Sequence, residues 1–139
     1  MGGINKMFNE LKNLSLDIKA KQEIRTGLKD DLTRQETKKT ELLKGLEEIK
    51  FNVESTILLG STAKEYKNEV ARKVAIKTAL TADYDFIKFN ERLESACLEI
   101  KKLERDLRVN QVEIEFLSRE FDIYLALANQ NNKTVSLAA

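Results

Sequence analysis

The fold is decided by the stretch from residue 86 to residue 128, which reads FIKFNERLESACLEIKKLERDLRVNQVEIEFLSREFDIYLALA. Its apolar residues recur at alternating intervals of three and four, the spacing that keeps one stripe of an α-helix against a partner helix. Only Asn110 in this stripe is strongly polar, and an asparagine at such a position fixes register or helix number at some cost in stability. The stretch predicts a long packed helix with Asn110 as its register residue. The stripe consists of Phe86, Phe89, Leu93, Ala96, Ile100, Leu103, Leu107, Asn110, Ile114, Leu117, Phe121, Tyr124 and Ala128.

A second stripe of the same spacing runs through the first part of the chain. It is apolar at both ends and polar in its middle, where Lys and Arg stems can lie along a partner while the charges reach water. Each stripe covers about 45 residues, or about 65 to 70 Å of helix at 1.5 Å per residue. Because the lengths match, we expect the two helices to pair antiparallel. The second stripe consists of Leu11, Leu14, Ile18, Lys21, Arg25, Leu28, Leu32, Gln35, Lys39, Leu42, Leu46, Ile49, Val53 and Thr56.

The segment between the two stripes predicts a short helix. Gly60 is expected to end the first long helix, and Ser61 or Thr62, followed by Glu65, forms a capping pattern for the next one. Thr81 or Asp83 is expected to cap the last helix. The middle helix is expected over residues 63–80, with an apolar face of Tyr66, Val70, Val74, Ala75 and Leu80.

Together these features predict an all-α fold, an elongated antiparallel coiled-coil hairpin of two long helices joined by a short middle helix. The expected helices cover residues 5–58, 63–80 and 84–128 and form a single helical domain, 1–128. The absence of proline, with only five glycines, leaves little of the chain for loops. Residues 129–139 have no apolar period, so we expect a flexible C-terminal tail.

The composition disfavours catalytic and metal chemistry. The chain has no histidine, which removes the commonest general base and the commonest transition-metal ligand. The single cysteine, Cys97, has no cationic cluster nearby, and neither a phosphate-binding Gly-rich loop nor a GxSxG turn is present. We therefore expect a protein without enzymatic activity, without a bound metal and without a cofactor.

No apolar run approaches the roughly 18 residues of a membrane span, and the N-terminal residues lack a signal core. We expect a cytoplasmic protein with no membrane partner.

Positive charge is concentrated in the middle segment. The net charge is only +1, so any nucleic-acid binding must use a local patch. This segment has five basic residues and only two acidic ones, Glu65 and Glu69. Such an excess of positive charge can bind phosphates without sequence preference. The alternative, which we favour, is a solvated helix face balanced by the chain from Asp83 onward, with eight basic and eleven acidic residues. The patch consists of Lys64, Lys67, Asn68, Arg72, Lys73 and Lys77.

A second apolar face is predicted on the last helix. Val109, Val112 and Phe116 lie off the main stripe. A narrow hairpin has a high ratio of surface to core, which favours self-association. We therefore expect a homo-oligomer, with these three residues as the self-association face.

The stretch from Tyr66 to Leu107 also carries a family resemblance. It combines a KNExxR element at residues 67–72, a short linker with the pair Asp83-Tyr84, and a long charged heptad helix. In these features residues 64–128 resemble small helical proteins encoded in the early regions of phages and prophages. The resemblance implies an accessory protein of phage replication, recombination or host takeover, in a group whose roles are mostly unassigned. It implies no catalytic residues.

The function expected from the sequence is that of a non-enzymatic helical interaction protein. It would be a phage-encoded accessory or inhibitor that self-associates and binds another protein, of unknown identity, in the host cell cytoplasm. The alternative is a nucleic-acid-binding accessory of phage recombination or replication that uses the basic middle helix.

Overall fold

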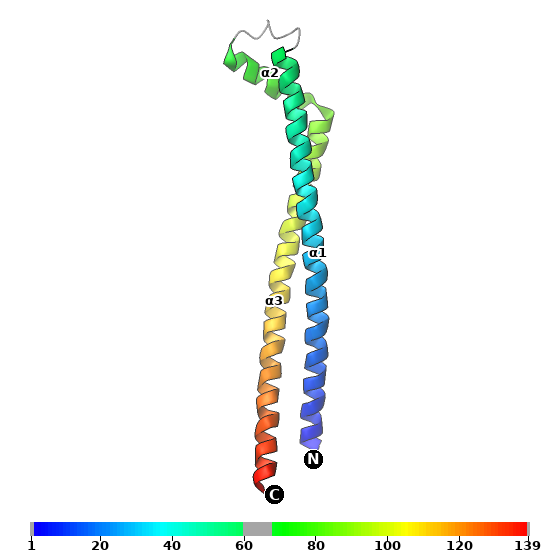
Figure 1. The fold of residues 1–139 in the computed structure, drawn as a ribbon, viewed down its shortest axis with the longest axis vertical. Helices are drawn as coiled ribbons and strands as arrows, with labels where there is room; N and C mark the ends of the chain where they lie inside the picture. Colours follow the sequence, from blue (N-terminus) through cyan, green and yellow to red (C-terminus); the bar gives the residue numbers. More distant parts are fainter. Residues whose placement is uncertain (1, 60–67, 139) are drawn as a thin grey trace. The chain divides into compact units, whose positions relative to one another are not determined.

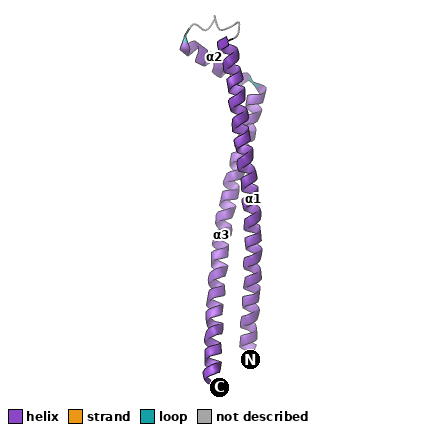
Figure 2. Cartoon of the chain, in the orientation of Figure 1, coloured by secondary structure: helices purple, strands orange, loops and turns teal. Residues whose placement is uncertain are grey.

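The computed structural model describes residues 2–59 and 68–138, which form three α-helices (Figure 1, Figure 2). These are α1 (Gly2–Leu59), α2 (Glu69–Ala82) and α3 (Tyr84–Ala138). Across these two ranges the chain contains no strand. The all-α fold predicted from the heptad stripes is therefore confirmed. Contacts divide the chain into two units, each of which contains a part of α1 and a part of α3.

The first unit, Met1–Asp31 with Leu103–Ala139, pairs the first half of α1 with the second half of α3. The side-chain amide of Asn110 reaches Lys21, and that of Asn131 reaches Met7. Because residue numbers fall along α1 as they rise along α3, the two segments are antiparallel (Figure 1). The buried apolar side chains of this unit are Leu11, Leu14, Leu103 and Ala128.

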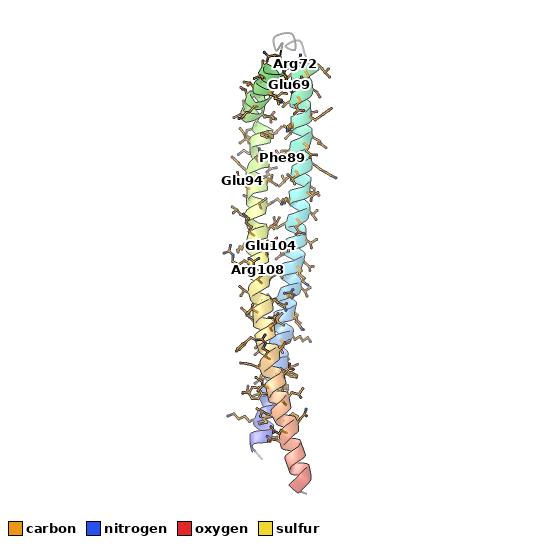
Figure 3. The ribbon with its side chains drawn as sticks, turned by 90° about the vertical axis from the view of Figure 1, so that its left-hand side faces the viewer. Glu69, Arg72, Phe89, Glu94, Glu104 and Arg108 are labelled. Carbon is orange, nitrogen blue, oxygen red and sulfur yellow. The ribbon has the colours of Figure 1, made fainter. Side chains whose placement is uncertain are left out.

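The second unit, Leu32–Lys102, contains the end of α1, all of α2 and the start of α3. Gly45 of α1 lies so close to Phe89 of α3 that a Cβ at this glycine would be 3.0 Å from Phe89 Cε1. Phe89 is labelled in Figure 3. The absence of a side chain at Gly45 therefore makes room for the Phe89 ring. The buried apolar side chains of this unit are Leu42, Ile57, Leu80, Ala96 and Ile100.

Both heptad stripes lie where the sequence predicts a packed face. Every residue of the α3 stripe is buried or half-buried, and so is every residue of the α1 stripe except Thr56. The polar members of the α1 stripe, Lys21, Arg25, Gln35 and Lys39, are half-buried. Their long side chains fit a seam position because the stem can pack while the polar end approaches water.

The short helix α2 packs with a different face from the one that the sequence predicts. Val70 and Val74 are exposed, so their assignment to the packed face is wrong, although Ala75 is half-buried and Leu80 is buried. The other half-buried residues of α2 are Ala71, Ile76 and Ala79. A face rich in alanine lets two helix backbones approach closely, which a face of valines does not. Tyr66, the remaining member of the predicted face, lies outside the described residues.

Side-chain caps mark the beginnings of α2 and α3. Asn68 is the N-cap of α2, and its side-chain oxygen accepts a hydrogen bond from Ala71 N at 2.7 Å. Asp83 caps α3 in the same way, because its Oδ1 accepts from Phe86 N at 2.8 Å. Of the two caps considered for α3, Asp83 is therefore correct, whereas the Thr81 hydroxyl donates to Lys77 O. The capping pattern expected from Gly60 to Glu65 lies outside the described residues.

The C-terminal part of the chain is helical, whereas the flexibility expected for residues 129–139 stays a prediction. Residues 129–138 continue α3 without interruption. This run lacks an apolar period, but it contains neither proline nor glycine. A helix that is already formed extends at little cost through such residues, because only nucleation is strongly unfavourable.

Candidate functional site

A polar layer interrupts the apolar seam of the first unit. Asn110 is 4% exposed, and its Nδ2 donates to the backbone carbonyl of Lys21 at 3.0 Å. The ammonium of Lys21 forms an ion pair with Glu113 at 2.5 Å. Among the described residues, Asn110 Oδ1 and Arg25 Nη1 are buried without a hydrogen-bond partner. Since the side chains of Lys21 and Glu113 meet in only one alignment of the two helices, this layer favours a single register.

The outer side of α3 carries exposed apolar residues at a regular spacing. Val109, Val112 and Phe116, which the sequence singled out, are between 52% and 64% exposed. Ile123, which lies seven residues after Phe116, is 60% exposed and belongs to the same row. We call these four residues the outer stripe. Their spacing of three, four and seven places them along one face of the helix, away from the seam that packs against α1.

Ile123 was missed in the sequence reasoning, although a signal for it was present. Val109, Phe116 and Ile123 are seven residues apart, so Ile123 occupies the same heptad position as the other two. Only Arg119 interrupts the row between Phe116 and Ile123. Four apolar side chains in one row make a patch of the kind that marks a contact with another chain.

Acidic residues border the outer stripe on both sides. Glu113 and Glu120 lie along one side, and Glu115 and Asp122 along the other. We call these four residues the acidic border. Glu113 is paired with Lys21, whereas no ion pair from the described part of the chain reaches the other three. Arg108, labelled in Figure 3, precedes the border and is exposed. The surface around the stripe is therefore mainly negative.

The basic patch predicted on the middle helix is only partly described. Arg72, Lys73 and Lys77 lie on α2 and are exposed, and Arg72 is labelled in Figure 3. Lys73 pairs with Glu69 one turn earlier at 3.3 Å, and both side chains are largely solvent-exposed. Asn68 serves as the helix cap. Lys64 and Lys67 lie outside the described residues, so the role of the patch stays a prediction.

An open apolar groove lies beside α2 in the second unit. It has a volume of about 690 Å³ and is lined by Ile57 of α1 together with small residues of α2, including Ala71, Ala75 and Ala82. Thr78 is the one hydroxyl residue among its lining residues. A groove with so few polar groups offers no means of orienting a polar substrate.

In the part of the chain that the structure describes, no group of three or more Cys, Asp or Glu side chains is placed to hold a metal ion. Cys97 is half-buried and unpaired. No helix in the described ranges is long and apolar enough to cross a membrane.

Comparisons of the chain with protein-family models, with curated proteins and with solved structures gave no match. The resemblance to early-region phage proteins therefore stays a prediction.

Proposed function

We propose that the chain is a non-enzymatic helical interaction protein whose outer stripe binds a helix of another chain. The observation that carries this proposal is the exposure of Val109, Val112, Phe116 and Ile123 in one row on α3. The seam side of α3 is already occupied by α1, so the stripe is available as a second packing face. Burying four such side chains on association provides a favourable hydrophobic contribution.

The rest of the molecule suits this role. Packing in the seam already holds α3 as a helix. This chain therefore loses little conformational entropy when a partner helix binds to the stripe. The buried and half-buried seam fixes which face of α3 packs against α1, and therefore which residues of α3 face outward. Helix recognition by rows of anchors at i, i+3 and i+7 is a common mode of protein binding.

The resemblance to early-region phage proteins extends the proposal. On this basis the chain acts in the cytoplasm of an infected cell, as an accessory or inhibitor of a phage or host protein. Self-association through the outer stripe is one form of the proposal, and binding of a different protein is the other.

A thiol-protection experiment tests whether the outer stripe is covered in the cell. In a Cys97→Ala background, Val112→Cys places a thiol on the stripe, and Leu16→Cys places one at an exposed control position on α1. We expect alkylation of the thiol at position 112 to be several-fold slower in the producing cell than in dilute purified protein, and alkylation at position 16 to be unchanged. Equal protection at both positions would contradict the proposal.

The second candidate function is nucleic-acid binding by α2. The observation in its favour is that Arg72, Lys73 and Lys77 are exposed on one short helix whose only acidic residue is Glu69. Contacts of this kind bind phosphates with an affinity that falls steeply as salt rises. Salt-dependent co-elution with DNA distinguishes this function from protein binding.

A further inference from the structure

We infer that the occupant of the outer stripe is an amphipathic helix with basic residues beside its apolar row, supplied by a different protein. This inference rests on the proposed function, because it names the partner of the same surface. Its basis is the charge of the residues beside the stripe, which would attract a basic partner helix and repel an acidic one.

The acidic border occupies the positions that decide partner choice between paired helices. Residues on either side of an apolar row lie opposite the corresponding residues of the partner helix, and their charges select the partner. From position 113 to position 122 all four bordering residues are acidic, namely Glu113, Glu115, Glu120 and Asp122. Glu113 is already paired with Lys21, so lysine or arginine at the facing positions of a partner would form attractive pairs with Glu115, Glu120 and Asp122.

A second copy of the chain offers mainly acidic residues opposite this border, with Arg108 as the exception. If two outer stripes pair antiparallel, Glu113 of one copy lies near Glu120 of the other, and Glu115 lies near Asp122. If they pair parallel, Glu115 lies near Glu120 and Arg119 lies against its own counterpart within the row, although Arg108 lies near Glu113 by the same spacing. Both arrangements bring like charges together, which is destabilising in paired helices. The stripe is therefore better matched to a basic partner than to itself.

The extent of the stripe sets the length of the partner helix. Val109 and Ile123 are separated by 14 residues, or about 21 Å of helix at 1.5 Å per residue. Phe116 stands at the middle and is the largest side chain of the row, so it is the expected anchor. Arg119 extends its aliphatic stem along the row while its charge reaches solvent. A partner segment of about three heptads covers the whole stripe.

Two designed peptides test the inference directly. Each has about three heptads with leucine in the apolar row, and one carries lysine beside the row whereas the other carries glutamate. Binding to the full chain is measured by fluorescence anisotropy at low and moderate salt. We expect the lysine peptide to bind about tenfold more tightly than the glutamate peptide, a difference of about 1.4 kcal/mol.

Protein variants locate the binding and test the charge rule. Phe116→Asp is expected to weaken lysine-peptide binding by about tenfold or more, whereas Leu16→Asp, at an exposed position of α1, leaves it unchanged. Glu115→Lys combined with Asp122→Lys is expected to reverse the preference in favour of the glutamate peptide. Circular dichroism of each variant checks that the helices remain folded.

Three outcomes would overturn the inference. Equal affinity for both peptides, lost in Phe116→Asp, would leave the stripe as a docking surface and remove the charge rule. Lysine-peptide binding that survives Phe116→Asp would show that the peptide binds acidic residues elsewhere. A stable dimer that dissociates in Phe116→Asp would assign the stripe to a second copy. The first and third outcomes leave the proposed function standing, so the failure of the inference is distinguishable from the failure of that proposal.

Discussion

The side-chain amide of Asn110 on α3 donates a hydrogen bond to the backbone carbonyl of Lys21 on α1, across the seam of the first unit. The same asparagine has a buried Oδ1 without a partner among the described residues. One hydrogen bond in a buried position contributes about 1 kcal/mol, whereas an unsatisfied buried acceptor costs about 1 to 3 kcal/mol. Asn110 therefore contributes more to the register of the helices than to their stability.

The first prediction follows from this balance. Asn110→Leu removes the unsatisfied oxygen and adds apolar contact, so we expect the free energy of unfolding to rise by about 1 to 2 kcal/mol. The measurement is urea unfolding followed by circular dichroism. Asn129→Leu, an exposed position on the same helix, serves as the control and should change stability by less than about 0.5 kcal/mol. Loss of stability in Asn110→Leu would mean that the amide stabilises the fold.

The second prediction compares two leucines of α3. Leu103 is 5% exposed, whereas Leu98 is 68% exposed. Leu103→Ala removes buried methyl groups and leaves a cavity, so we expect a loss of about 2 to 4 kcal/mol in the free energy of unfolding. Leu98→Ala should cost less than about 0.5 kcal/mol. Similar losses in thermal unfolding for the two variants would contradict the assignment of the seam.

The third prediction concerns Gly27 and Gly45, which lie away from the ends of α1. At Gly27 an added Cβ meets no atom within 4 Å, whereas at Gly45 it would lie 3.0 Å from the Phe89 ring. Gly27→Ala is therefore expected to raise the free energy of unfolding by about 0.5 to 1 kcal/mol. Gly45→Ala should give no gain, because the ring must shift.

A double substitution separates helix propensity from the ring contact. In a Phe89→Leu background, Gly45→Ala is expected to recover about 0.5 to 1 kcal/mol of stability relative to Gly45. Equal gains from Gly27→Ala and Gly45→Ala in the unmodified chain would show that the close approach of Phe89 is not a constraint.

The fourth prediction addresses nucleic acid. If the chain acts by protein docking, its light-scattering mass during size-exclusion chromatography stays the same when short single-stranded or double-stranded DNA is added at moderate salt. A salt-sensitive complex that is lost on replacement of Lys67, Arg72 and Lys73 by glutamate would favour the second candidate function. Retained helicity in that variant excludes unfolding as the cause.

The seam was predictable from sequence because one physical signal determines it. Apolar residues repeated every three or four positions have only one face to bury, and a long repeat excludes other registers of the same helix. The α3 stripe extends over six heptads with Asn110 as its only strongly polar member, and all of it lies in the seam. The same heptad spacing places Lys21 and Arg25 in the α1 stripe, and both are half-buried despite their charge.

The packing of α2 was not predictable in the same way. A helix of 14 residues contains about four turns, so two different apolar rows fit it almost equally well. Hydrophobicity favoured Val70 and Val74, whereas the packed face is formed by Ala71, Ala75 and Ala79 with their larger neighbours. The choice depends on how closely α2 approaches other helices, which is a tertiary property. The identity of an interaction partner is not predictable from this sequence, because the chain encodes only one side of the interface.

The most direct test of the central claim, that the outer stripe binds a different protein, is site-specific photo-crosslinking in the cell that naturally produces the chain. A photo-reactive phenylalanine analogue replaces Phe116 in one variant and Leu16 in the control. We predict a discrete adduct only from position 116, with a mass that differs from that of two 15.9 kDa chains. No discrete adduct from position 116, or the same adduct from both positions, would contradict the claim.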